Sequence, residues 1–230
     1  MRGLFVTGTD TGVGKTVLSA ALVAAMVGAG EDVSAYKPML TGTEEPPQEP
    51  WPADHELLGS VSGQPAEQVA PRRFGPAVSP HLATELQASP ITAQELLADA
   101  RQAAARAGAG VLVVEGVGGL LVPLTEGYAV RDLARELGLG LLIAARPGLG
   151  TINHTLLTLE AARAVGLEVH AVVLTPWSLA PSPMELSNRD TIARLGSVDV
   201  HLLEALERPD RQSLARAGAT LPWRTWLTRD

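Results

Sequence analysis

The residues best suited to chemistry lie near the start of the chain, in the segment LFVTGTDTGVGKT at positions 4–16. Residues 4–7 have the apolar and β-branched character of a buried strand, and residues 15–22 that of a helix. A glycine-rich turn between them lets backbone N–H groups point at phosphate oxygens, and the helix dipole adds positive charge there. The pattern predicts a nucleotide-phosphate site, with Lys15 on the β- and γ-phosphates and the Thr16 hydroxyl on Mg²⁺.

The glycine spacing differs from the common phosphate-binding motif G-x-x-x-x-G-K-[ST]. Five residues separate Gly8 from Gly14, which is one more than the motif allows. The alternative is a chance glycine turn ahead of a helix. Because the strand and the helix both occupy the places that the motif requires, we favour the phosphate site.

Further candidate residues follow two other predicted strands. Lys37 comes directly after a strand predicted over residues 33–36, and Glu115 after a wholly apolar strand predicted over 111–114. Ligands of open parallel sheets bind outside the carboxyl ends of the strands, so both side chains are expected beside the phosphate loop. Glu115 is either an acidic Mg²⁺ ligand or a cap of the glycine turn that follows it. Asp54 is likewise either the N-cap of a helix over 55–61 or a metal ligand.

A second glycine loop, residues 146–150, opens a helix predicted over 151–165. The backbone N–H groups of Thr151, Ile152 and Asn153 would be exposed at the start of this helix, which makes it a second candidate anion site. His81 lies in a rigid Ser79-Pro80-His81 element, and its position by itself indicates no particular chemistry.

Length and composition suit one α/β domain over residues 1–230. The net charge of −7 argues against a protein that binds nucleic acid or a membrane surface. The absence of cysteine excludes disulfides and thiolate chemistry and fits a cytoplasmic protein. No signal segment precedes the first strand, and no apolar run approaches the ~20 residues that span a bilayer. We therefore expect a soluble cytoplasmic protein.

Strands and helices are expected to alternate along the chain. The predicted strands cover residues 4–7, 33–36, 111–114, 140–144, 169–174 and 198–203. The predicted helices cover residues 15–27, 55–61, 92–107, 128–137, 151–165 and 184–195. This alternation predicts an α/β fold with a doubly wound, mostly parallel sheet and helices on both faces. Trp223 and Trp226 are expected to anchor the C-terminal tail.

Six segments occur in an order that points to one family. They are VTGTDTGVGKT at 6–16, YKP at 36–38, TGT at 41–43, SPH at 79–81, VEGVGGL at 114–120 and GTINHTLLT at 150–158. Together they resemble the dethiobiotin synthetases, a family of P-loop NTPases in biotin biosynthesis. The extra residue of the phosphate loop is that family's own pattern.

The resemblance implies an ATP-dependent cyclo-ligase that joins CO₂ to 7,8-diaminopelargonic acid and releases dethiobiotin, ADP and phosphate. One amine would capture CO₂ as a carbamate, and the carbamate would attack the γ-phosphate to give a carbamic-phosphoric anhydride. The second amine would then close the ring. Lys15 would neutralise the γ-phosphate, Lys37 would stabilise the carbamate and the moving phosphoryl group, and Thr11 would hydrogen-bond the substrate.

The resemblance also implies a set of ligand contacts. Mg²⁺ would be held by Thr16, Asp54 and Glu115. Nucleotide contacts would come from Gly12, Val13, Gly14, Lys15, Thr16, Val17, Asp54, Glu115, Gly116, Val117, Gly118, Thr175 and Pro176. The diamine would contact Thr11, Lys37 and Thr41, and its distal carboxylate would bind at Gly150, Thr151, Ile152 and Asn153 of a second subunit. The active site would then lie at the interface of a homodimer.

The chain departs from the family pattern in the phosphate loop and after the strand predicted over residues 169–174. Gly12 stands where some members have Glu, and Thr175-Pro176 stand where members that read adenine often carry Asn-Asp. The base preference among nucleoside triphosphates therefore stays open.

Two other classes share the expected fold. Switch ATPases of the partition or septum-placement type typically carry an extra lysine early in the phosphate loop, where this chain has Thr9 and Asp10. Amide-forming ligases of the cobyrinate type usually carry a glutaminase domain with a nucleophilic cysteine, and this chain has no cysteine. The cyclo-ligase is the better fit.

Overall fold

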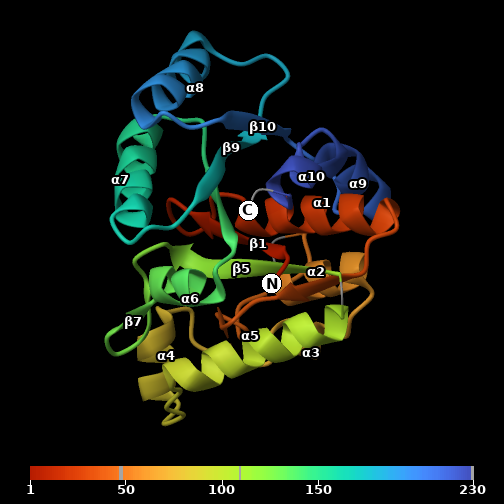
Figure 1. Cartoon of the computed structure of the whole chain (residues 1–230), viewed down its shortest axis with the longest axis vertical. Helices are drawn as coiled ribbons and strands as arrows, with labels where there is room; N and C mark the ends of the chain where they lie inside the picture. Colours follow the sequence, from red (N-terminus) through yellow and green to blue (C-terminus); the bar gives the residue numbers. More distant parts are fainter. Residues whose placement is uncertain (47–48, 109, 229–230) are drawn as a thin grey trace.

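A six-stranded parallel sheet forms the centre of the fold (Figure 1). The structure is a computed structural model that describes residues 1–46, 49–108 and 110–228. In spatial order the strands are β10 (Val200–Glu204), β9 (Val169–Trp177), β8 (Gly140–Ala145), β1 (Gly3–Gly8), β5 (Val111–Gly119) and β2 (Val33–Tyr36). Because the later strands extend the sheet on both sides of β1, the loop after β1 lies where the strand order reverses, which is where such sheets bind ligands.

Helices cover both faces of this sheet, which confirms the doubly wound prediction (Figure 1). One face carries α1 (Lys15–Gly28), α2 (Asp54–Ser62), α9 (Arg211–Ala219) and α10 (Trp223–Trp226). The other face carries α5 (Ala93–Ala107), α6 (Val130–Leu137), α7 (Thr151–Arg163) and α8 (Pro183–Gly196). Short elements in the connections are β3 (Leu40–Thr41), α3 (Ala66–Val69), β4 (Arg73–Phe74), α4 (Pro80–Leu86), β6 (Pro123–Thr125) and β7 (Tyr128–Ala129).

Alternate side chains of the central strand enter two separate cores. Phe5 packs into the core beneath α5 to α8, while Leu4 and Val6 pack into the core beneath α1, α2, α9 and α10. A strand covered on both faces needs apolar residues at every position, not at every second one. This requirement explains the wholly apolar character of the strand predicted over residues 111–114.

Local predictions are wrong at three places because neighbouring elements decide the local structure. Ala53, not Asp54, is the N-cap of α2, and the Asp54 carboxylate instead accepts a hydrogen bond from Lys37. The strand β5 does not end at residue 114, since it continues beside β1 until Gly119 lies opposite Gly8. Residues 128–129 are not helical, because they pair with β6 in an antiparallel hairpin before α6 begins.

The C-terminal helices pack against the helix that follows the phosphate loop (Figure 1). Trp223 and Trp226 are buried in the same core as α1, which confirms that they anchor the tail. α9 approaches α1 so closely at Gly218 that an added Cβ would overlap the Ala21 carbonyl. The C-terminal helices α9 and α10, which were not predicted, therefore pack against α1 and support it.

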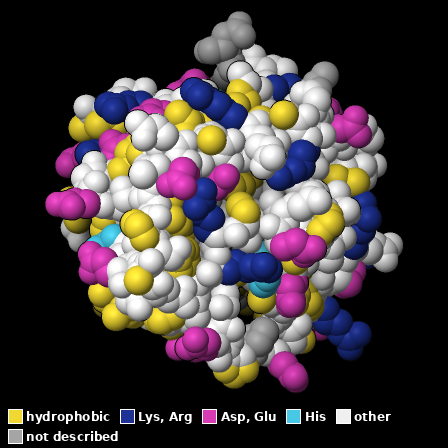
Figure 2. Space-filling view, turned by 90° about the horizontal axis from the view of Figure 1, so that it is seen from below, with side chains coloured by type: hydrophobic (Ala, Val, Ile, Leu, Met, Phe, Trp, Pro, Cys, Tyr) yellow, Lys and Arg dark blue, Asp and Glu magenta, His cyan; other side chains and the backbone are white. Residues whose placement is uncertain are grey.

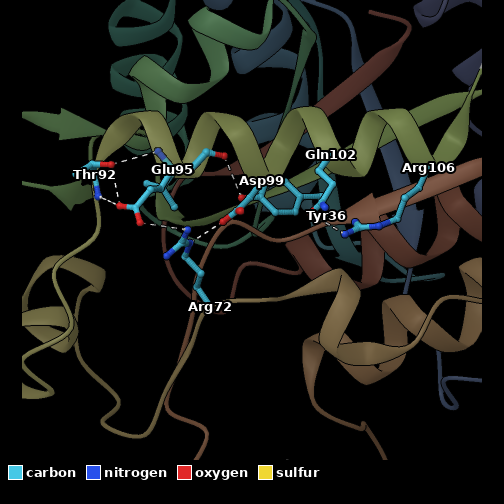
Figure 3. A network of polar contacts seen from close by, with 8 residues as sticks. Tyr36, Arg72, Thr92, Glu95, Asp99, Gln102 and Arg106 are labelled. Carbon is cyan, nitrogen blue, oxygen red and sulfur yellow. Dashed lines mark hydrogen bonds and ion pairs between the residues drawn. The ribbon is translucent and has the colours of Figure 1, made fainter.

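A polar network fixes α5 to the segment before β4, away from the phosphate loop (Figure 3). A capping box begins α5, because Thr92 Oγ1 accepts from the Glu95 N–H at 3.2 Å and Glu95 Oε2 accepts from the Thr92 N–H at 2.8 Å. The Arg72 guanidinium donates to Asp99 at 2.6 Å, and the Tyr36 hydroxyl donates to the main chain of α5. These contacts position β2, the strand that delivers Lys37.

Acidic and basic side chains are interspersed on the face shown in Figure 2. Across the described ranges of the chain, no helix combines the length and the apolar character that a membrane crossing needs.

Candidate active site

The loop between β1 and α1 is closed around the Lys15 side chain. Gly14 at the N-cap of α1 has φ +92° and ψ +17°, a left-handed conformation that favours glycine. The loop also packs tightly on β9, because a Cβ at Gly14 would lie 2.7 Å from Thr175 Cγ2. Lys15 Nζ donates to the Asp10 carbonyl at 2.7 Å, so both ends of the loop are tied together.

This loop opens onto a cleft of about 780 Å³, a volume typical of small-ligand sites. The predicted residues that line it are Thr11, Gly12, Gly14, Lys15, Thr16, Val17, Lys37, Thr41, Asp54, Val117 and Gly118. The lining also includes Glu45, Trp51, Val78, Ser79 and Pro80, none of which was predicted as a site residue. Residues from five separate segments therefore meet at one cavity.

Beside the cleft, one ammonium group lies between two carboxylates. In the register of β2 and β5, Tyr36 lies opposite Val114, so the residues that follow them, Lys37 and Glu115, are neighbours. Lys37 Nζ donates to Glu115 Oε1 at 2.6 Å and to Asp54 Oδ2 at 2.7 Å. Thr16 Oγ1 donates to the same Glu115 oxygen at 2.9 Å. This network brings together the starts of α1 and α2, the end of β2 and the middle of β5.

The surroundings shift the pKa values of the two lysines of this site in opposite directions. Burial, aided by repulsion from Lys37, lowers the pKa of Lys15 to about 8. Burial also opposes the charge of Lys37, but Asp54 and Glu115 outweigh it and raise the pKa of Lys37 above its usual value. For Asp54, burial opposes ionisation, and the Lys37 charge nevertheless holds the pKa of the carboxyl below its usual value. At neutral pH the Lys37–Asp54 pair is therefore charged.

The oxygen donors of Thr16, Asp54 and Glu115 suit Mg²⁺, which prefers oxygen ligands. Mg²⁺ usually takes some of its ligands from the protein and the others from water and from the phosphates of a substrate. Glu115 is 1% exposed, and its Oε2 atom has no hydrogen-bond partner among the described residues. A cation would satisfy this buried oxygen. Within the described residues no three His, Asp or Glu side chains form a metal cluster by themselves, so the hydroxyl of Thr16 is part of the fit.

Some predicted residues lie outside the cleft lining. Val13, Glu115 and Gly116 are buried, while Thr175 is buried against Gly14 and Pro176 is exposed.

None of the residues of the predicted anion site at the start of α7 lines the cleft. Gly150 and Asn153 are exposed, and Ile152 is half-buried. Thr151 is buried, and its N–H donates to the Gly148 carbonyl at 3.3 Å. Residues 150–153 are therefore not brought to the cleft of their own subunit.

Two residues that support the phosphate loop were not predicted. Arg146 donates from Nε and Nη2 to the Gly12 carbonyl, at 3.1 and 2.8 Å. Asn188 of α8 donates to the carbonyls of Pro147 and Gly148. Arg146 follows β8 as Lys37 follows β2, so the rule that ligands gather at strand ends could have found it. Asn188 lies inside a helix, and the pattern carries no comparable signal for it.

Comparison with known proteins identifies the family. A family model described as an AAA domain matches residues 2–208. The ATP-dependent dethiobiotin synthetase BioD of Anaeromyxobacter sp. (strain Fw109-5) is 44% identical over 195 residues, covering 85% of this chain and 86% of the relative. The chain belongs to the dethiobiotin synthetase family.

Other dethiobiotin synthetases match over similar or greater lengths. BioD of Bacillus subtilis (strain 168) is 37% identical and covers 87% of this chain and 85% of the relative. BioD of Mycobacterium sp. (strain KMS) is 39% identical over 228 residues, which is 99% of this chain and 98% of the relative. The family resemblance and the P-loop α/β fold expected from the sequence are thereby confirmed.

The buried Lys37–Glu115 pair yields a prediction on stability. Removal of one partner leaves the other buried without its counter-charge, so Lys37→Met and Glu115→Gln should each lower the free energy of unfolding by about 3 kcal/mol. The double variant should lose less than the sum of the two. Urea titrations at pH 7 in the presence of EDTA measure all four proteins.

The exposed Arg2–Glu31 ion pair, at 2.6 Å, is the matched control. Its double-mutant cycle, with glutamine at both positions, should give a coupling of at most about 1 kcal/mol. Equal coupling in the two pairs would contradict the importance of burial for Lys37 and Glu115.

Proposed function

We propose that this chain is an ATP-dependent cyclo-ligase that forms dethiobiotin from 7,8-diaminopelargonic acid and CO₂. The observation that carries the proposal is the meeting of the phosphate loop with Lys37 and Asp54 at one cleft, where Glu115 is hydrogen-bonded to both Lys37 and Thr16. A phosphate loop alone would serve any nucleotide-binding protein. The relatives of this chain are named ATP-dependent dethiobiotin synthetases. We also propose that the enzyme is cytoplasmic, which its cysteine-free composition supports.

The reaction would proceed through three bond-forming steps. One amine of the substrate adds to CO₂ and loses a proton, which gives a carbamate. A carbamate oxygen then attacks the γ-phosphorus, the bond from that phosphorus to ADP breaks, and a carbamic-phosphoric anhydride forms. The second amine attacks the carbonyl carbon of the anhydride, forms the second C–N bond and expels phosphate. Each step gains from positioned positive charge, because the negative charge is redistributed along the path.

The two lysines of the cleft would supply that charge. The chain contains only two lysines, Lys15 and Lys37, and both line the cleft. Lys15 starts α1 and would neutralise the γ-phosphate, while Lys37 would stabilise the carbamate and the phosphoryl group in transfer. Thr11 and Thr41 line the same cleft and would hydrogen-bond the diamine or its carbamate.

Thr16, Asp54 and Glu115 would hold Mg²⁺, which supplies charge neutralisation to the phosphates when bound. The backbone of residues 12–17 and 115–118 would contact the nucleotide. We propose ATP as the nucleotide, with Thr175 and Pro176 near the end of β9 as the positions that bear on the choice of base.

We also propose that the enzyme acts as a homodimer. Leu149, Leu121 and Leu157 are 93%, 56% and 56% exposed, although large apolar side chains are usually buried. Leu121 and Leu157 also line an apolar pocket of about 440 Å³ beside Thr9 and Asp10 of the phosphate loop. A second copy on this surface would bury the leucines and would place its residues 150–153 near the first cleft, where they could bind the substrate carboxylate.

A phosphate-release assay tests the proposed reaction. Purified protein with Mg²⁺, ATP and bicarbonate should release phosphate only after 7,8-diaminopelargonic acid is added, with dethiobiotin detected by mass spectrometry. Parallel reactions with CTP and GTP identify the preferred base. Phosphate release without the diamine, or release that depends on an added protein partner, would instead favour a switch ATPase.

The Lys37→Ala variant tests the assigned role of this side chain. Loss of the ammonium should lower kcat by at least about 100-fold, while the affinity for nucleotide stays within about threefold of the parent protein. The assay is run at a temperature where circular dichroism shows the variant to be folded. An unchanged kcat would remove Lys37 from the mechanism.

Substitution of Leu157 tests the dimer. Leu157→Asp should yield a monomer in sedimentation velocity and should raise the KM for the diamine, because the second subunit no longer reaches the cleft. Leu195→Asp on α8 is the matched control, since Leu195 is 55% exposed but does not line the pocket beside the phosphate loop. A Leu157→Asp protein that remains dimeric would disprove this interface.

A further inference from the structure

The loop between β8 and α7 is held rigidly from one side by α8. Asn188 is 7% exposed, and its Nδ2 donates to the carbonyls of Pro147 and Gly148 at 2.9 and 3.2 Å. Gly148 also accepts from the Thr151 N–H at 3.3 Å. A buried side-chain amide that satisfies two consecutive carbonyls fixes the path of the main chain at this point.

From the other side, the same loop reaches the phosphate loop through Arg146. Two nitrogens of the guanidinium, Nε and Nη2, converge on the single carbonyl oxygen of Gly12. The planar guanidinium offers its donors in a fixed geometry, so two donors on one oxygen define the direction of that carbonyl. Gly12 has φ +68°, and a Cβ at this position would lie 3.0 Å from Arg146 Nη2. The contact is therefore fitted to glycine at position 12.

The direction of the Gly12 carbonyl decides where the next N–H points. In a planar trans peptide the carbonyl and the following N–H point to opposite sides. With the Gly12 oxygen held toward Arg146, the Val13 N–H turns away from Arg146 to the opposite side of the loop. Backbone N–H groups of such loops are the donors that bind phosphate oxygens, so the orientation of this peptide affects nucleotide affinity.

We propose that Arg146 is a positioning residue for the phosphate loop and that Asn188 holds it in place through residues 147–148. This brace orients the peptide between Gly12 and Val13 before the nucleotide arrives. This proposal depends on one part of the proposed function, namely that a nucleotide binds at the phosphate loop. It requires neither the diamine nor any step of ring closure.

Direct binding measurements test the brace. Because Arg146 is exposed, Arg146→Ala should fold normally, and its Kd for a non-hydrolysable ATP analogue with Mg²⁺ should rise about tenfold by calorimetry. Arg146→Lys should give an intermediate Kd, since a lysine offers a point charge instead of two fixed donors. Arg163→Ala is the matched control, because Arg163 at the far end of α7 also donates to a main-chain carbonyl, that of Ser197 at 3.2 Å. Its Kd should be unchanged.

The NMR signals of the two lysines distinguish a positioning role of Arg146 from a general effect on stability. Protein labelled with ¹³C-lysine should show two side-chain ε-methylene signals, from Lys15 and Lys37. Lys15 donates to the Asp10 carbonyl within the same loop, so Arg146→Ala should shift the Lys15 signal without added nucleotide. The Lys37 signal should stay in place, and Arg163→Ala should move neither signal.

The role of Asn188 is tested by non-additivity. Asn188→Ala should raise the same Kd, and the Arg146→Ala/Asn188→Ala protein should bind no more weakly than Arg146→Ala alone, because both residues act through one loop.

An unchanged Kd and an unmoved Lys15 signal in Arg146→Ala would overturn the proposal. Additive effects would overturn the part assigned to Asn188. A protein that shows these effects and yet makes no dethiobiotin would disprove the ligase function and leave the brace standing.

Discussion

The charge balance of one buried ammonium group governs the whole site. Lys37 is 4% exposed and Glu115 is 1% exposed, so either charge alone would carry a desolvation cost of several kcal/mol. Their contact at 2.6 Å offsets that cost, and it exists only when β2 lies beside β5 in the register that places Tyr36 opposite Val114. Asp54 and Thr16 then join the same network, so formation of the sheet and assembly of the site are one event.

The division of labour between lysine and arginine follows from their chemistry. Of the 18 basic residues two are lysines, which leaves 16 arginines, and both lysines lie in the cleft. A compact ammonium on a flexible stem can follow charge that moves between substrate and phosphate, whereas a guanidinium suits a fixed, directional contact. Arg146 on the Gly12 carbonyl and Arg72 on Asp99 are contacts of this second kind.

Much of the fold could be predicted because its signals are local. Runs of mostly apolar residues marked the strands β1, β5 and β8, and the helix predicted over residues 92–107 corresponds to α5. The errors fall where a distant partner overrides the local pattern. Asp54 is a residue type that often caps helices, but its carboxylate instead accepts a charge-assisted hydrogen bond from the buried Lys37, which follows β2. Residues 128–129 fit a helix until β6 pairs with them.

By itself, the sequence determined the phosphate loop, the alternation of strands and helices, and the family, because each depends on residue types at fixed short spacings. Only the tertiary structure decided that Lys37, Asp54, Glu115 and Thr16 form one network. The same holds for the hydrogen bonds from Arg146 to the carbonyl of Gly12, 134 positions earlier. These contacts depend on which strands become neighbours and in what register. That choice is made by burial of both faces of the sheet, which no local spacing encodes.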